Sequence, residues 1–320
     1  MVCLSGPRRQ LGPVIRVDLA AFQHGTAPSL HLQLRRHARQ HADEVALFCF
    51  AEEDFDRAGL SGSPPLPAVL ASLIAAGISV LDAVYVHGDR LRAAPGFSSS
   101  EDEDEEQNQP VRGPGGGDPQ VQALAAATAL TGRAVLANRQ AVRWSIAGPS
   151  GAAAAEASAA LHAAADALLG VVGRSGPVDS RRMRQIAADT VSRALTQAGE
   201  SGGVEAPICA MLALLLCDVE IRDTVIGRAV KEPDAPWLPM LIAVARSIPD
   251  EDAAEVCAVL SIAAYCRGDG PLAQVAVDRC LTAEPDHRLA HLMLSAMTSA
   301  LPPEQLGEMI SRLVLRSGTA

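Results

Sequence analysis

The sequence predicts an α/β N-terminal domain with a mixed, partly parallel sheet, followed by an all-α helical bundle. Residues 1–93 alternate short β-branched apolar runs with amphipathic helical segments, the pattern of strands and helices packed in layers. Residues 119–320 have helical periodicity throughout. Aromatic residues make up only 3% of the chain, so alanine, valine and leucine must form the core. Alanine and leucine are strong helix formers, which agrees with the long helical half.

The N-terminal domain is expected to run strand, helix, strand, helix, strand. The strand segments are rich in β-branched and apolar residues, and the continuous run at 45–50 is typical of a strand covered on both faces. The helices show apolar positions one turn apart, and Gly77 is expected to end the second one. The expected elements are a strand at 14–19, a helix at 28–42, a strand at 45–50, a helix at 66–76 and a strand at 78–86, which residues 87–90 turn toward a short hairpin.

Residues 1–4 (MVCL) also have the pattern of a strand, and Gly12-Pro13 is expected to end the turn that follows them. A chain that opens inside a strand suggests a start placed too far downstream. We therefore expect the first domain to be truncated at its N-terminus.

Residues 94–118 are expected to form a disordered acidic and glycine-rich linker between a domain at 1–93 and a helical domain at 119–320. Six consecutive acids at 101–106 account for more than half of the net charge of −10, and a Gly-Pro-Gly-Gly-Gly run follows them. Such a segment has too little apolar surface to bury. The serines before the acids have the pattern of a phosphorylation site as well as that of a solvated linker.

The helical domain contains one repeat with a recognisable register. Residues 254–287 match the thirty-four-residue tetratricopeptide hairpin, with Ala273 and Cys280 at positions where two antiparallel helices approach closely. An ordinary hairpin inside a bundle explains the same pattern. The expected helices are 119–131, 137–146, 152–171, 178–198, 205–217, 219–230, 236–247, 251–266, 271–283, 287–300 and 303–316.

Composition argues against several classes of protein. No basic stripe with interleaved aromatics is present, so nucleic-acid binding has little support. The longest apolar run, 206–217, is shorter than a membrane span needs, and the N-terminus lacks the apolar core of a signal peptide. The seven cysteines are odd in number, scattered and never spaced C-x-x-C, as in a reducing compartment. We therefore expect a cytoplasmic protein that uses no membrane and no nucleic acid.

Nucleophile and metal motifs are weak. The chain has no P-loop, no G-x-G-x-x-G after a strand and no H-E-x-x-H. A G-x-S-x-G match surrounds Ser201 but follows a helix, whereas a nucleophile elbow follows a strand. Two His-x3-His pairs, at 37 and 41 and at 287 and 291, place imidazoles on one helix face without a convincing third ligand. A capping or surface role is favoured for both pairs, and no metal or cofactor is assigned.

Acids near strand ends are the better catalytic candidates. In an open α/β sheet, ligands bind beyond the carboxyl ends of the strands. Asp18 lies near the end of one expected strand, Glu52 follows another, and Asp82 lies within a third. These acids are expected either to form a pocket for a small ligand or divalent cation, or to serve as helix caps and loop solvation.

In order along the chain, these segments resemble an uncharacterised actinobacterial family, domain of unknown function number 4192. That resemblance implies no activity. Members usually begin with a further helix and strand, and they carry an aromatic and cysteine-rich stretch where residues 91–118 are acidic and glycine-rich here. The matching stretches are 16–19 (RVDL), 80–83 (VLDA) with Gly88 and Arg90, 132–136 (GRAVL), 218–219 with 222–223, and 267–270 (RGDG) through Pro285.

The residues favour a non-catalytic interaction or scaffold protein that binds a protein partner through its helical domain. The alternative is an enzyme or small-ligand binder that uses Asp18, Glu52 and Asp82. The hypothesis rests on the tetratricopeptide register and on the scarcity of well-placed catalytic motifs.

Overall fold

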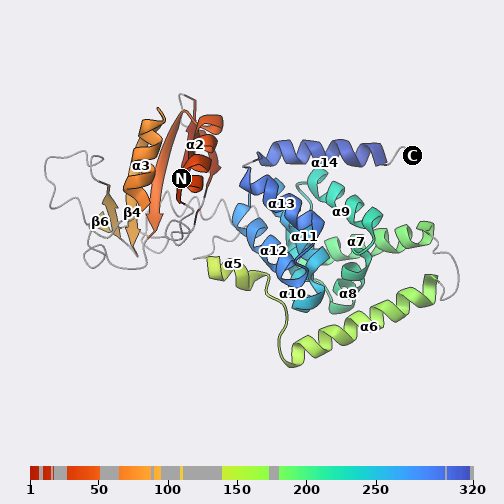
Figure 1. The fold of residues 1–320 in the computed structure, drawn as a ribbon. Helices are drawn as coiled ribbons and strands as arrows, with labels where there is room; N and C mark the ends of the chain where they lie inside the picture. Colours follow the sequence, from red (N-terminus) through yellow and green to blue (C-terminus); the bar gives the residue numbers. More distant parts are fainter. Residues whose placement is uncertain are drawn as a thin grey trace. The chain divides into compact units, whose positions relative to one another are not determined.

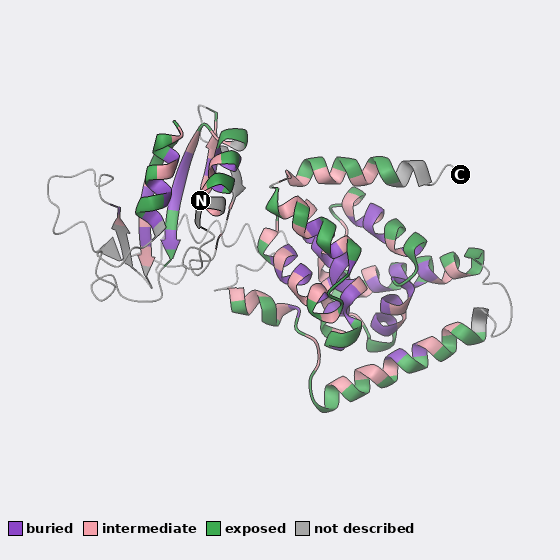
Figure 2. Ribbon diagram, viewed as in Figure 1, coloured by how far each residue is buried: buried purple, intermediate pink, exposed green. Residues whose placement is uncertain are grey.

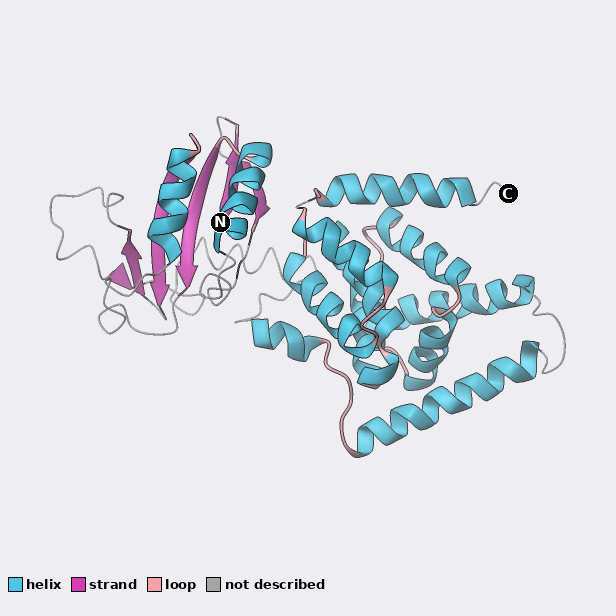
Figure 3. Cartoon of the chain, in the orientation of Figure 1, coloured by secondary structure: helices cyan, strands magenta, loops and turns pink. Residues whose placement is uncertain are grey.

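The computed structural model describes residues 1–6, 10–15, 17, 27–50, 65–87, 90–94, 109–110, 139–172, 180–299 and 301–317. The chain divides into two compact units, residues 1–133 and 134–320. The expected boundaries at 93, 94–118 and 119 stay a prediction, because most of the segment between the units lies outside the described residues. The first unit carries the sheet and the second is helical (Figure 1; Figure 3).

The first unit contains a mixed six-stranded sheet in the order β2-β1-β3-β4-β5-β6, which confirms the predicted fold class. Only β3 and β4 pair in parallel, and the other neighbours pair antiparallel. The parallel pair is joined through helix α3, since parallel strands need a crossover connection. The elements are β1 Val2–Ser5, β2 Gln10–Val14, α2 Ala27–His41, β3 Glu44–Phe50, α3 Pro65–Ala75, β4 Ser79–His87, β5 Arg90–Ala93 and β6 Gln109–Pro110.

The second strand differs from its prediction. It covers Gln10–Val14, so Gly12 and Pro13 lie inside a strand and do not end a turn. Of the expected strand at 14–19, residues 15 and 17 lie outside any strand, and residues 16, 18 and 19 lie outside the described residues. The strand β2 is at the sheet edge, where a proline that lacks an N–H is tolerated. The pairing with β1 shifts between Val2 and Leu4, which accommodates the extra residue as a bulge. Edge position and pairing, not local apolar pattern, decided where this strand lies.

The sheet buries one face against α2 and α3. In β3 the alternate residues Val45, Leu47 and Cys49 are buried, and they join a core that includes Leu34 of α2 and Leu73 of α3. In Figure 2 most of β3 is coloured as buried.

The opposite face of the sheet is more open than predicted. Phe48 and Phe50 of β3 are 43% and 68% exposed. Their partners across the parallel ladder, Val84 and Val86, are half-buried. The expectation that β3 is covered on both faces is therefore wrong for its C-terminal half. Both faces of this strand carry apolar residues, so the sequence pattern does not distinguish the packed face from the exposed one.

Two residues of the expected linker belong to the sheet. Gln109 and Pro110 form β6, which pairs with Arg90 and Leu91 of β5. The prediction of disorder is wrong at these two positions, because their backbone completes an antiparallel ladder. Residues 95–108 and 111–118 lie outside the described residues, as does the helix expected at 119–131.

The helical unit follows the predicted series closely, with most boundaries within two residues. The sequence predicts these boundaries because glycine, proline and acidic capping residues stand at many of the helix ends. Gly202 adopts a left-handed φ of 70° just after helix α7. The elements are α5 Arg139–Ser145, α6 Ala152–Val172, α7 Ser180–Ser201, α8 Ala206–Leu215, α9 Val219–Lys231, α10 Trp237–Ser247, η2 Asp250–Asp252, α11 Ala254–Cys266, α12 Gly270–Ala283, α13 Arg288–Thr298 and α14 Pro303–Ser317.

Helices α11 and α12 form a tight hairpin. Gly268 takes a φ of 74° at the turn, where a side chain would be strained, and Asp269 caps α12 by accepting a hydrogen bond from the amide of Leu272. Ala273 and Cys280 are completely buried, as their predicted packing positions require. The hairpin is therefore present, whereas its kinship to tetratricopeptide repeats stays a prediction.

Arg279 of α12 ties three segments together. Its side chain is 10% exposed, and it donates hydrogen bonds to the carbonyls of Ile146, Ala245 and Ile248 at 2.6–2.8 Å. A further bond reaches Oδ1 of Asp250 at 2.8 Å. Two of these carbonyls lie at the C-terminal end of α10 and one lies just after α5. The guanidinium therefore bonds carbonyl oxygens at helix ends, where the acceptors have no regular helical partner.

Replacing Gly148 with alanine is expected to destabilise the helical unit by about 1–3 kcal/mol, as for other overpacked sites. A Cβ there would lie 2.5 Å from Nη2 of Arg279 and 2.7 Å from the carbonyl oxygen of Ile248. Chemical unfolding followed by the fluorescence of buried Trp237 measures the change.

Gly170→Ala is the matched control, because nothing lies within 4 Å of a Cβ at this exposed position in α6. It should leave stability unchanged or raise it slightly, since alanine favours helix. Equal effects of the two substitutions would contradict the tight contact at Arg279.

Candidate functional site

The structure describes one of the three acids predicted to form a pocket. Asp82 lies within β4 and its Oδ1 accepts a hydrogen bond from the amide of Ala83 at 2.8 Å. Its pairing partner in β3 is Ala46, which places it on the same face of the sheet as Phe48. Asp18 and Glu52 lie outside the described residues. The acidic pocket therefore stays a prediction.

The two histidine pairs differ in their surroundings. His37 is buried in α2, and nothing is described of the side chain of His41. His287 is the N-cap of α13, where its Nδ1 accepts from the amide of Ala290, and Nε2 of His291 lies 2.7 Å from the carbonyl of Pro285. The capping role predicted for the second pair is confirmed at His287. Among the described residues no group of three or more potential ligands is placed to hold a metal ion.

Ser201 ends helix α7 and is no nucleophile elbow. Its hydroxyl donates to the carbonyl of Gln197 at 2.9 Å, one helical turn back. A helix precedes it, as predicted, and the amide of Gly203 donates to its Oγ at 3.3 Å. The G-x-S-x-G spacing here belongs to a helix terminus.

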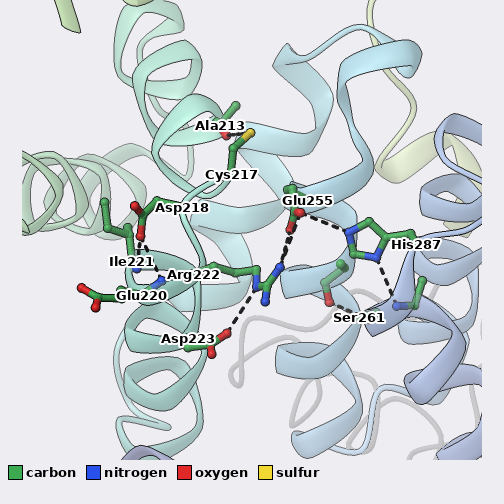
Figure 4. Close-up of polar contacts among 12 residues, drawn as sticks. Ala213, Cys217, Asp218, Glu220, Ile221, Arg222, Asp223, Glu255, Ser261 and His287 are labelled. Atoms are coloured by element: carbon green, nitrogen blue, oxygen red, sulfur yellow. Dashed lines mark hydrogen bonds and ion pairs between the residues drawn. The ribbon is translucent and has the colours of Figure 1, made fainter. Parts of the chain in front are cut away.

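A polar cluster joins α9, α11 and α13 (Figure 4). Arg222 of α9 donates to both carboxylate oxygens of Glu255 at 3.3 and 3.5 Å, and Nε2 of His287 lies 3.4 Å from Oε1 of Glu255. The side chains of Arg222, Glu255 and His287 are 16%, 23% and 4% exposed. Glu255 thus faces two donors from helices on either side of it, in a partly desolvated place where such contacts are stronger than at the surface.

Neighbouring residues of α9 support the cluster. Asp218 caps this helix by accepting from the amides of Glu220 and Ile221, and Asp223 pairs with Nε of Arg222 at 3.3 Å. Asp218, Arg222 and Asp223 are among the residues that carry the family resemblance, as are Arg267 and Asp269 of the hairpin turn. In this fold Asp218 and Asp269 cap helices, and Arg222 and Arg267 tie segments together. Asp223 pairs with the adjacent Arg222 on the same helix.

The loop between α9 and α10 is fixed by two arginines. Arg228 stacks over the ring of Trp237, 5.1 Å from its centroid, and pairs with Glu232 at 3.0 Å. The hydrogen bond from Arg228 lowers the pKa of Glu232. Arg267 donates to the carbonyls of Glu232 and Pro233 at 3.1 Å. These contacts hold the end of the hairpin's first helix against the preceding helix pair.

All seven cysteines are free, and most are buried. Burial raises the pKa of Cys257 to about 11 and that of Cys280 to about 12, so both thiols stay protonated near neutral pH. Cys217 as a residue is exposed. The partial burial of its sulfur atom and the nearby carboxylate of Glu255 nevertheless raise the pKa of its thiol. Because the thiolate is the nucleophile, none of these three residues is activated for covalent chemistry.

A groove of about 530 Å³ lies along α14. Val230 of α9 and Cys266 of α11 contribute apolar lining, and α14 contributes Glu304, Glu308 and Arg312. Arg312 pairs with Glu308 at 3.1 Å one turn away. No local pattern in the sequence indicates this groove, because its walls come from three helices that are separated in the chain. The same holds for the cluster around Glu255.

No helix in the described part of the chain has both the length and the apolar character needed to cross a membrane.

Comparison with known proteins identifies the family and nothing more specific. Residues 1–304 match the family model described as "Domain of unknown function (DUF4192)". Since the match covers nearly the whole chain, the protein belongs to this family, which confirms the resemblance. Neither the curated proteins nor the solved structures contain a match to the chain.

Thiol labelling of the native protein at about pH 8 is expected to modify Cys217 much faster than Cys257 or Cys280. The labelling reagent cannot reach Cys257 and Cys280, because both are completely buried. Their thiols also form the reactive thiolate only at far higher pH. Mass spectrometry of labelled peptides distinguishes the sites. Labelling of Cys257 in the folded protein at a rate similar to that of Cys217 would contradict the packing of the hairpin.

Proposed function

We propose that this member of the DUF4192 family is a cytosolic, non-catalytic interaction or scaffold protein, which binds a protein partner through its helical unit. The observation that carries the proposal is the surface around α14. Met309 and Leu313 lie one turn apart on this helix and are 51% and 62% exposed. Other residues of the same helix line the groove that α14 forms with α9 and α11. Adjacent exposed apolar side chains on one face of a helix are typical of protein-binding surfaces.

The polar residues of the helical unit support the same proposal. Arg222, Arg267 and Arg279 direct their guanidinium groups to carboxylates and carbonyls inside the unit. Asp218 and Asp269 cap helices. A rigid scaffold needs such ties, because a binding surface built on fixed helices loses little entropy when a partner docks.

Further details of the proposal come from the sequence. The free, scattered cysteines support a reducing, cytosolic compartment. The thirty-four-residue register of the α11–α12 hairpin supports a tetratricopeptide-like element, a class that presents helical surfaces to partners. The proposal also includes an actinobacterial source, which the family resemblance suggests. It includes the acidic linker as a spacer between the two units.

Met309→Glu combined with Leu313→Glu is expected to weaken partner capture about tenfold or more, since buried anchors dominate interface energies. Both side chains are exposed, so the substitution should leave folding intact. Affinity capture from native lysate with quantitative mass spectrometry measures the change for each protein that the wild-type chain enriches.

Leu169→Glu is the matched control, because Leu169 is 48% exposed on α6, away from α14 in sequence. It should capture the same proteins as the wild-type chain. If the wild-type chain enriches no protein, or if the double variant retains the full set, the proposal fails.

A further inference from the structure

Helix α13 begins at a histidine that uses both ring nitrogens. His287 is 4% exposed, and its Nδ1 accepts a hydrogen bond from the amide of Ala290 at 3.3 Å. Its Nε2 lies 3.4 Å from Oε1 of Glu255. An N-cap must accept, so Nδ1 carries no proton in this arrangement, and Nε2 carries the proton that points toward the carboxylate.

We infer that His287 is a pH-sensitive cap, which releases the first turn of α13 when the imidazole takes up a second proton. That proton can attach only at Nδ1, because Nε2 already holds one. Nδ1 then becomes a donor that faces the donor N–H of Ala290, and the capping bond is lost. The positive charge also lies at the helix N-terminus, where the macrodipole disfavours cations.

Glu255 gives the protonated ring an alternative contact. The imidazolium is attracted to the carboxylate at 3.4 Å, which Arg222 also contacts. Protonation therefore exchanges a cap on α13 for a stronger tie to α11. Glu255 of α11 contacts the ring, and Arg222 of α9 contacts Glu255. Other charged and titratable groups on the neighbouring elements include Glu284 at the end of α12, and Asp286, Arg288 and His291 on the segment of His287 itself.

The histidine is suited to this role because imidazole is the side chain that changes charge within the physiological pH range. Serine, asparagine or aspartate would cap α13 as well, but serine and asparagine cannot titrate and aspartate titrates at much lower pH. The inference does not depend on the proposed function, since it concerns the start of α13 and not the surface around α14.

Hydrogen exchange of the full chain at about pH 7.5 and about pH 5 tests this inference. In the wild-type protein the protection factor of the Ala290 amide, corrected for intrinsic exchange, should fall about fivefold at the lower pH, as expected for loss of an N-cap. In H287N the protection should be equal at both pH values, because the asparagine Oδ1 accepts from Ala290 and does not titrate. Unchanged protection in the wild-type chain, or an equal loss in H287N, overturns the inference.

Two further variants separate the contributions. H291N removes the other histidine of α13, which is exposed, and should keep the wild-type pH response. E255Q removes the carboxylate that the imidazolium contacts, so the loss of Ala290 protection at about pH 5 should be smaller than in the wild-type chain. An E255Q protein with the wild-type transition would show that Glu255 has no part in the exchange. A thermal melt of each variant at the higher pH verifies that the fold is retained.

Discussion

Helix α11 is the element on which the helical unit depends. From Val256 to Ala264 every residue is buried, so neighbours must cover the helix on all sides. Helix α12 covers one side through the small residues Ala273 and Cys280, and a larger residue at either position would hold the two helices apart. Aromatic residues make up only 3% of the chain, so large side chains contribute little to the core. Apolar contact comes instead from small side chains that let the helices approach closely. The surrounding helices are positioned by this requirement.

Arginines then connect the segments that apolar packing brings together. Arg279 donates hydrogen bonds to carbonyls of α10 and of the loop after α5. Arg267 donates to a carbonyl of the α9–α10 loop, and Arg222 donates to the carboxylate of Glu255. Guanidinium suits this task, because its planar fork donates in several directions at once and keeps its charge when partly buried. These contacts occupy polar groups of the helical unit that would otherwise be candidates for binding or chemistry.

The N-terminal unit follows a different rule. Its sheet has helices α2 and α3 packed against one face, while Phe48 and Phe50 lie on the other with substantial exposure. Mixed pairing follows from the connections. A helix separates the parallel strands β3 and β4, whereas only a few residues separate the strands of the antiparallel pairs β1–β2 and β4–β5 in the sequence.

The amino-acid sequence by itself determined the local elements: the helices, their caps and glycine stops, the hairpin turn at Gly268, and the parallel strand pair, because periodicity and end signals act within a few residues. Tertiary structure decided what depends on partners distant in sequence. Edge pairing placed β2 at Gln10–Val14 despite Pro13, and packing of α9, α11 and α13 brought Arg222, Glu255 and His287 together. Residues more than thirty positions apart leave no local pattern that predicts their contact. The groove along α14 arose in the same way, from helices that only the folded chain sets side by side.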